Sequence, residues 1–148
     1  PPPPQVSSSL PFMLFGIGRL IGRDLEIRLA DLGLSLSTLG VLGHLATSPQ
    51  MSYSDLARRT DVTVQSIHTT VRRMITDGLI TAKDTTGQAT ALTVTRQGRD
   101  RLEAAAASLN AFEQQLLTDA HLDSATLKPA ILGLTKSAWA LRIAHNLD

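Results

Sequence analysis

The apolar and polar residues between positions 54 and 78 follow the period of two short helices. The first helix is expected over residues 54–60 and the turn after it over residues 61–62, while Thr63 caps the second helix and Gly78 ends it. The apolar residues of the second helix share one face: Ile67, Val71, Met74 and Ile75. Short polar side chains occupy the opposite face. A helix, a tight turn and an amphipathic second helix form the helix-turn-helix pattern.

Two short runs rich in β-branched residues follow, over residues 79–83 and 90–94. A polar stretch that contains Gly87 separates them, which predicts a β-hairpin. Thr95 then caps a further helix. This order predicts a mainly α fold with a small β-hairpin wing, a winged helix-turn-helix, over residues 35–100.

Long apolar stripes mark both ends of the chain. Residues 1–9 are rich in Pro and Ser and predict an extended N-terminal arm, after which Ser9 caps a long helix over residues 10–34. Residues 101–148 contain two further helices, the last of which Pro129 either kinks or starts. We expect these terminal helices to dimerise and the whole chain to form one compact domain, because the stripes exceed what a small winged domain covers.

The residues expected at the dimer interface are Leu10, Leu14, Ile17, Leu109, Phe112, Leu134 and Leu141. The alternative is that the terminal helices pack on one another within a monomer. A dimer is favoured because helix-turn-helix proteins commonly place two recognition helices about 34 Å apart, in successive major grooves.

The charge of the chain is unevenly distributed. Among 148 residues, 14 are Lys or Arg and 13 are Asp or Glu, which gives a net charge of +1. Residues 52–101 hold eight Lys or Arg against five Asp, a net charge of +3, and the rest of the chain therefore carries −2. Positive charge on the winged region is what attraction to DNA phosphates requires, although solvated helix faces are often as basic.

The chain has no cysteine, which excludes disulfides, thiolate metal sites and a thiol-based sensor. No run of residues is long and apolar enough for a membrane span, and no basic secretion signal is present. We therefore expect a cytoplasmic protein without a membrane partner.

Three motifs combine along the chain: DLARR in the first short helix, SIHTTVRRMITDGLI in the second helix and its exit, and LTVTRQGRDRL after the hairpin. Together they resemble the multiple antibiotic resistance regulator (MarR) family of bacterial transcription factors. The resemblance implies a homodimer that binds a pseudo-palindromic duplex of DNA and represses promoters. It also implies release of the DNA by a small aromatic or otherwise apolar effector.

The polar face of the second helix is expected to meet DNA. Base edges in the major groove would be read by Gln65, Ser66, His68 and Thr69. Phosphate and wing contacts would come from Arg58, Arg72, Arg73, Lys83, Thr85, Thr86 and Gln88. Each arginine has an alternative role, as a solvated side chain or as the ion-pair partner of Asp55, Asp61 or Asp77.

Gln88 departs from the family pattern. Family members carry an Arg near the wing tip, in a pattern similar to D-x-R-A, and that Arg enters the minor groove. Counting back from Thr95 places Gln88 at this position. Gln can hydrogen-bond to bases or sugars but brings no charge to a narrow minor groove, so Lys83 is the cation that the hairpin retains.

By resemblance, an effector pocket would lie where the long first helix and a helix over residues 37–47 meet the winged region. Phe15 would form a wall, Arg19 would pair with a carboxylate, and His44 would orient the ligand. The alternative is that Phe15 and His44 belong to the core and Arg19 is solvated.

Other classes of function have weaker signals. The four histidines lie on separate elements without metal-ligand spacing, and no serine lies on a turn that exposes a nucleophile. We therefore expect no metal, no cofactor and no enzymatic activity, and we expect Tyr53 and Trp139 to be packing residues. The rival hypothesis is a protein-interaction module that kept the winged fold but binds another regulator instead of DNA, which Gln88 and the small charge excess would fit.

Overall fold

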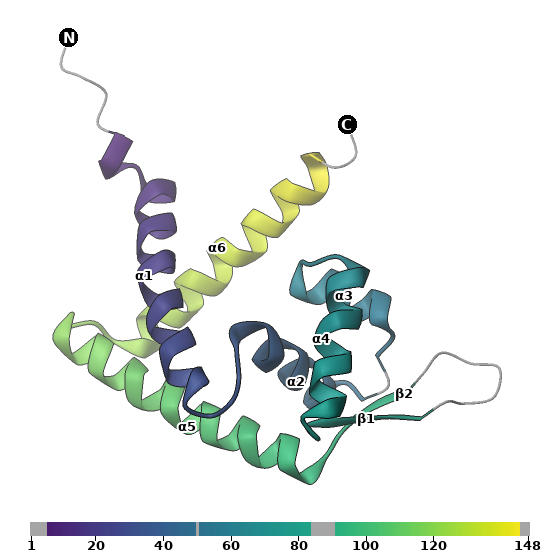
Figure 1. The fold of residues 1–148 in the computed structure, drawn as a ribbon. Coiled ribbons are helices and arrows are strands. Elements are labelled where there is room, and N and C mark those ends of the chain that lie inside the picture. Colours follow the sequence, from purple (N-terminus) through teal and green to yellow (C-terminus); the bar gives the residue numbers. More distant parts are fainter. Residues whose placement is uncertain (1–5, 50, 84–90, 146–148) are drawn as a thin grey trace. The chain divides into compact units, whose positions relative to one another are not determined.

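The computed structural model describes residues 6–49, 51–83 and 91–145 (Figure 1). Its elements are η1 (Val6–Ser8), α1 (Leu10–Ala30), α2 (Leu36–Thr47), α3 (Tyr53–Thr60), α4 (Val64–Thr76), β1 (Ile80–Lys83), β2 (Ala91–Val94), α5 (Arg96–Asp119) and α6 (Ser124–His145). Contacts group the chain into two compact units, Pro1–Ser108 and Leu109–Asp148, which are described separately. We expected one compact domain, and the expected boundary after residue 100 lies inside the continuous helix α5.

The N-terminal segment differs from the expected extended arm. Val6–Ser8 form a turn of 3-10 helix, so the prediction of extended backbone is wrong at these residues. Residues 1–5 lie outside the described range. Ser9 then occupies the N-cap position of α1 and Pro11 lies in the first turn, where a missing backbone N–H costs no helical hydrogen bond.

Helix α1 ends at Ala30 and not at residue 34 as expected. Gly33 adopts a left-handed conformation (φ 67°), and the amide of Leu34 donates to the carbonyl of Leu29 at 2.9 Å. This hydrogen bond closes the C-terminus of the helix, because a left-handed residue reverses the chain direction at low cost when it is glycine.

Helix α2 supplies much of the core of the first unit. It begins with a capping box: the amide of Thr38 donates to the Ser35 hydroxyl at 3.2 Å, and the amide of Ser35 donates to the Thr38 hydroxyl at 2.8 Å. The helix packs against α3, α4 and β2. Its fully or nearly fully buried apolar side chains are Val41, Leu42 and Leu45.

Helices α3 and α4 form the predicted helix-turn-helix. Asp61 makes the turn in a left-handed conformation (φ 57°), and the hydroxyl of Thr63 accepts from the amide of Ser66 at 3.1 Å. Three of the four predicted apolar residues of α4 are buried: Ile67, Val71 and Met74. Ile75 is 39% exposed, so its predicted burial is wrong. It lies about 80° around the helix from Ile67, at the edge of the apolar stripe.

The hairpin is held to the core at its base. Ile80 pairs with Val94 and Lys83 pairs with Ala91 in an antiparallel register. Ile80, Leu92 and Val94 are buried, whereas Thr81, Lys83 and Thr93 are exposed. Burial alternates along β2, where Leu92 and Val94 face the core, whereas β1 is buried at Ile80 and exposed from Thr81 to Lys83.

The exit of α4 is bonded to the start of α5. The amide of Thr95 donates to the carbonyl of Leu79 at 3.0 Å, and its hydroxyl donates to the carbonyl of Gly78 at 2.7 Å. The same hydroxyl oxygen accepts from the amide of Gly98 at 3.0 Å, which confirms the predicted cap. A Cβ at Gly98 would run into the Leu79 carbonyl oxygen and would lie 2.9 Å from Cγ1 of Val94.

The second unit, Leu109–Asp148, contains the end of α5 and helix α6. Asp123 caps α6 by accepting from the amide of Thr126 at 2.9 Å. The carboxylate of Glu113 lies 2.7 Å from the ammonium group of Lys128. This contact is the main cause that lowers the pKa of Glu113 below its ordinary value.

We predict that Gly98→Ala lowers the free energy of unfolding by about 1–3 kcal/mol, because the added methyl group has no room beside the Leu79 carbonyl. Gly43→Ala is the matched control, since a Cβ there has no neighbour within 4 Å and Ala favours a helix interior. Urea unfolding of both variants measures the difference. Equal stabilities would contradict the close approach of α5 to Leu79.

Candidate nucleic-acid interface

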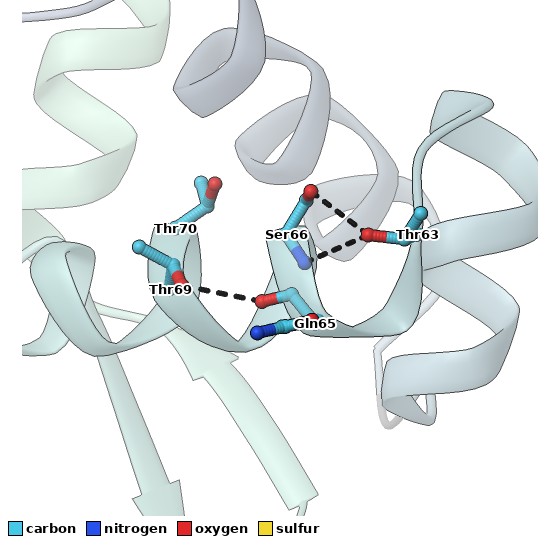
Figure 2. A pocket seen from close by; sticks show the side chains of 5 residues that line it. All are labelled: Thr63, Gln65, Ser66, Thr69 and Thr70. Carbon is cyan, nitrogen blue, oxygen red and sulfur yellow. Dashed lines mark hydrogen bonds between the residues drawn. The ribbon is translucent and has the colours of Figure 1, made fainter.

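Helix α4 carries a row of exposed polar side chains opposite its buried face. The row consists of Gln65, Thr69 and Arg72, at helical spacing. The hydroxyl of Thr69 donates to the backbone carbonyl of Gln65 at 3.2 Å (Figure 2). The methyl group of Thr69 and the amide of Gln65 take no part in that hydrogen bond. Two of the four residues predicted to read bases thus lie in this row.

Ser66, the third of these residues, belongs to the cap of α4. Its hydroxyl lies 2.9 Å from the hydroxyl of Thr63 (Figure 2). An open depression of about 400 Å³ surrounds this cap, and its lining residues are Thr63, Gln65, Ser66, Thr69 and Thr70. Because its hydroxyl is already hydrogen-bonded within the cap, Ser66 is less available to a base edge than Gln65 or Thr69.

Each flank of α4 contacts another helix. On one flank, the hydroxyl of Thr70 lies 3.4 Å from the hydroxyl of Ser37 in α2. On the other flank, the imidazole of His68 stacks on the ring of Tyr53 in α3, with ring centroids 4.0 Å apart and an angle of 12° between the ring planes. His68, the fourth predicted base-reading residue, is therefore engaged with α3. Tyr53 is a packing residue, as expected.

Some of the predicted phosphate-binding arginines are engaged in ion pairs and others are not. Arg58 contacts the carboxylate of Asp55, and Nε of Arg73 lies 3.6 Å from the carboxylate of Asp77. The ion-pair alternative therefore applies to both arginines. Arg72 is exposed and has no ion-pair partner within the described part of the chain.

Asp55 is held ionised by its surroundings. The Ser52 hydroxyl donates to the Asp55 carboxylate at 2.7 Å, which is the main cause that lowers the pKa of Asp55, and Arg58 lowers it further. Because the Asp55 carboxylate stays charged, it offsets part of the positive charge of Arg58. Arg58 must therefore exchange this partner in order to bind a phosphate.

Arg59 is a candidate that sequence reasoning did not select. It is exposed on α3, has no ion-pair partner among the described residues, and lines an open depression of about 560 Å³ together with Ser48 and Met51. The pair of adjacent arginines in the DLARR motif was a signal for it. Only the geometry of Asp55 showed which of the two arginines is paired.

The predicted wing residues fall mostly outside the described ranges. Thr85, Thr86 and Gln88 belong to residues 84–90, so their predicted contacts remain predictions. Lys83 is described: it is exposed and ends β1.

The structure brings together two of the three predicted effector residues. The guanidinium carbon of Arg19 lies 5.9 Å from the centroid of the Phe15 ring, within cation–π distance. Arg19 also lines a depression of about 560 Å³ between α1 and the start of α2, with Gly22, Arg23, Glu26, Ile27 and Leu36. His44 is half-buried further along α2 and does not line this depression, and neither does Phe15.

Several residues predicted at the dimer interface are exposed in the single chain. They are Leu10, Ile17, Leu134 and Leu141, while Leu14, Leu109 and Phe112 are half-buried. Pro129 lies inside α6 and does not start it. Large apolar side chains left at the surface of a monomer favour a covering partner.

Residues 32–89 match the model of the MarR family. The HTH-type transcriptional repressor Rv2887 of Mycobacterium tuberculosis is 29% identical over 110 residues, which cover 73% of this chain and 79% of the relative. The crystal structure of M. tuberculosis Rv2887 in complex with DNA is similar to this chain with a TM-score of 0.70 at 26% identity, covering 87% of this chain and 97% of that one. These matches support a winged-helix regulator of the MarR family.

A second structure of Rv2887, in complex with salicylic acid, has a TM-score of 0.67 at 27% identity and covers 87% of this chain and 96% of that one. The predicted resemblance to the MarR family and the predicted winged helix-turn-helix fold are therefore confirmed. The family match begins before α2 and ends before β2, so it contains α4 and β1.

Two further findings apply to the described ranges of the chain. No helix there offers a stretch long and apolar enough to cross a bilayer. In the same ranges, no three His, Asp or Glu side chains lie close enough together to hold a metal ion.

Proposed function

We propose that this chain is a homodimeric transcription regulator that binds a pseudo-palindromic duplex of DNA sequence-specifically and represses transcription until a small apolar or aromatic effector binds. The observation that carries the proposal is the exposed row of Gln65, Thr69 and Arg72 on a helix whose opposite face is buried. The related repressor Rv2887 has been crystallised in complex with DNA and with salicylic acid, which supports both parts.

The chemistry of the row suits the major groove. The Gln65 amide can both donate to and accept from adenine, and the Thr69 methyl group can contact the methyl group of thymine. Ser66 and His68 lie beside the row and make secondary contacts. Arg72, Arg59 and Lys83 supply positive charge for phosphates without breaking a described ion pair. Arg58 and Arg73 contribute after exchanging Asp55 and Asp77 for phosphate.

The rival function is a protein-interaction module with little or no specific DNA binding. The paired arginines Arg58 and Arg73 favour it, because they reduce the charge available to phosphates. A gel shift with DNA from upstream of the chain's own gene separates the two functions. The regulator forms a complex that weakens steeply with salt and resists competition by random duplex, whereas the rival forms no such complex.

We predict different effects for two residues of the row. Binding is measured on the upstream DNA segment that forms the specific complex, called here the operator. Thr69→Ala should lower the preference for operator over random duplex by about 1–3 kcal/mol, because a base contact is lost. Arg72→Ala should weaken binding to both duplexes and reduce the slope of log affinity against log salt by about one.

Arg73→Ala is the matched control for Arg72→Ala, since Arg73 is already paired with Asp77 and should change the salt slope less. Fluorescence anisotropy at several salt concentrations gives both quantities. A loss of equal size on operator and random duplex for Thr69→Ala would remove Thr69 from the base-reading set.

We predict that Leu141→Asp yields a monomeric or unfolded chain without specific operator binding. Leu141 is exposed in the single chain, and a charge placed there would be desolvated when a second copy covers it. Lys136→Asp is the control. Side chains two positions apart on a helix point about 200° away from each other, so Lys136 lies opposite the interface residue Leu134. Light scattering reports the mass, and a folded Leu141→Asp dimer would contradict the assignment.

An aromatic carboxylate would occupy the depression beside Arg19, whose guanidinium would pair with the carboxylate. The Phe15 ring, which does not line the depression, lies 5.9 Å from the guanidinium carbon of Arg19. We predict that salicylate weakens operator binding and that operator weakens salicylate binding by the same factor. Arg19→Ala should abolish the effect, whereas the exposed Lys136→Ala should retain it. Identical salicylate affinities with and without operator would contradict release of DNA by this ligand.

A further inference from the structure

The stacked rings of Tyr53 and His68 join the two helices of the helix-turn-helix at the edge of the polar row. Tyr53 is the first residue of α3, and His68 lies one turn into α4. The nearly parallel rings, 4.0 Å apart, cover one face of each other. A stacked contact of this kind favours the observed relative orientation of the two rings.

Stacking leaves the polar edges of both rings available. Hydrogen bonds of a phenol and an imidazole lie near the plane of the ring, whereas stacking occupies the face. Among the described residues, no hydrogen bond is made by the Tyr53 hydroxyl or by either imidazole nitrogen of His68. His68 is exposed and Tyr53 is half-buried. The phenol oxygen of Tyr53 and the imidazole nitrogens of His68 are therefore not engaged by other described residues.

The position of Tyr53 and His68 indicates which part of the DNA they would contact. The outermost residues of α4 are Gln65, Thr69 and Arg72, and His68 lies on the side of the row that faces α3. In helix-turn-helix proteins the first helix crosses the DNA backbone while the second enters the major groove. Side chains joined to the start of α3 thus meet the sugar-phosphate chain. The carboxylate in the first turn of α3, that of Asp55, is engaged by Ser52 and Arg58.

We propose that Tyr53 and His68 form one paired phosphate contact, in which the phenol hydroxyl and an imidazole N–H donate to oxygens of the DNA backbone. Tyr53 has two roles: it binds the phosphate, and its ring positions His68. This inference rests on the proposed DNA binding. It assigns Tyr53 to the interface and moves His68 from base reading to backbone binding.

Ring-preserving variants test the contact. Tyr53→Phe and His68→Phe keep two stacked aromatic rings but remove the donors. Each should weaken binding to operator and to random duplex equally, by about three- to tenfold, which is the range for one hydrogen bond. Melting temperatures should stay near that of the wild type. Glu103→Gln, an exposed change on α5, is the control and should bind as the wild type does.

The coupling of the two residues is tested by a double-mutant cycle. In a Tyr53→Ala background, where the ring that positions His68 is gone, His68→Ala should weaken binding by less than twofold. A methylphosphonate at the contacted phosphate should abolish the difference between the wild type and the double Phe variant.

Three results would overturn the proposal. Loss on operator alone would make the pair a base contact. Wild-type affinity of both Phe variants, with the wild type still binding its operator, would leave the stack a purely structural contact and the proposed function intact. Absence of any specific complex with the wild type would remove the proposed function and this inference together.

Discussion

The carbonyl oxygen of Leu79 is the point on which the positions of α4, the hairpin and α5 depend. It accepts a hydrogen bond from the amide of Thr95 at 3.0 Å, and Gly98 approaches it so closely that no side chain fits between them. Gly78, with φ of 71°, allows the chain to turn from α4 into the strand just before this point. Two glycines and one threonine thus fix the end of α4 to the start of α5.

A helix fixed at its end and supported on both flanks presents its outer row with little freedom. Ser37 contacts one flank of α4 and Tyr53 contacts the other. Gln65, Thr69 and Arg72 remain outside, with the buried face anchored by Ile67 and its neighbours. Preorganised side chains lose less conformational entropy on binding, which favours specific contacts over loose ones.

The elements set by local chemistry were predictable from the sequence. The Thr63 cap, the left-handed Gly78 and the Thr95 cap each depend on residues close in the chain, and all three are confirmed. The end of α1 was misplaced because the apolar stripe continues to Leu32, whereas the helix ends at Ala30 ahead of the left-handed Gly33. Ile75 was misjudged because periodicity does not locate the edge of a buried stripe.

The details of the interface were less predictable, because they depend on side chains from different helices. Sequence alone left open which arginine each aspartate binds, and the structure pairs Asp55 with Arg58 and Asp77 with Arg73. The stack of Tyr53 on His68 joins residues 15 positions apart, without a motif that signals it. The base-reading roles of Gln65 and Thr69 remain predictions.

Selection of duplexes from a random pool by the purified chain, followed by sequencing, tests the central claim most directly. If two copies of α4 enter successive major grooves, the selected duplexes should share two inverted half-sites whose centres are about 10 base pairs apart, or a multiple of that distance. A pool that stays random after repeated selection, or that converges on a single half-site, would contradict a dimeric regulator that reads DNA through α4.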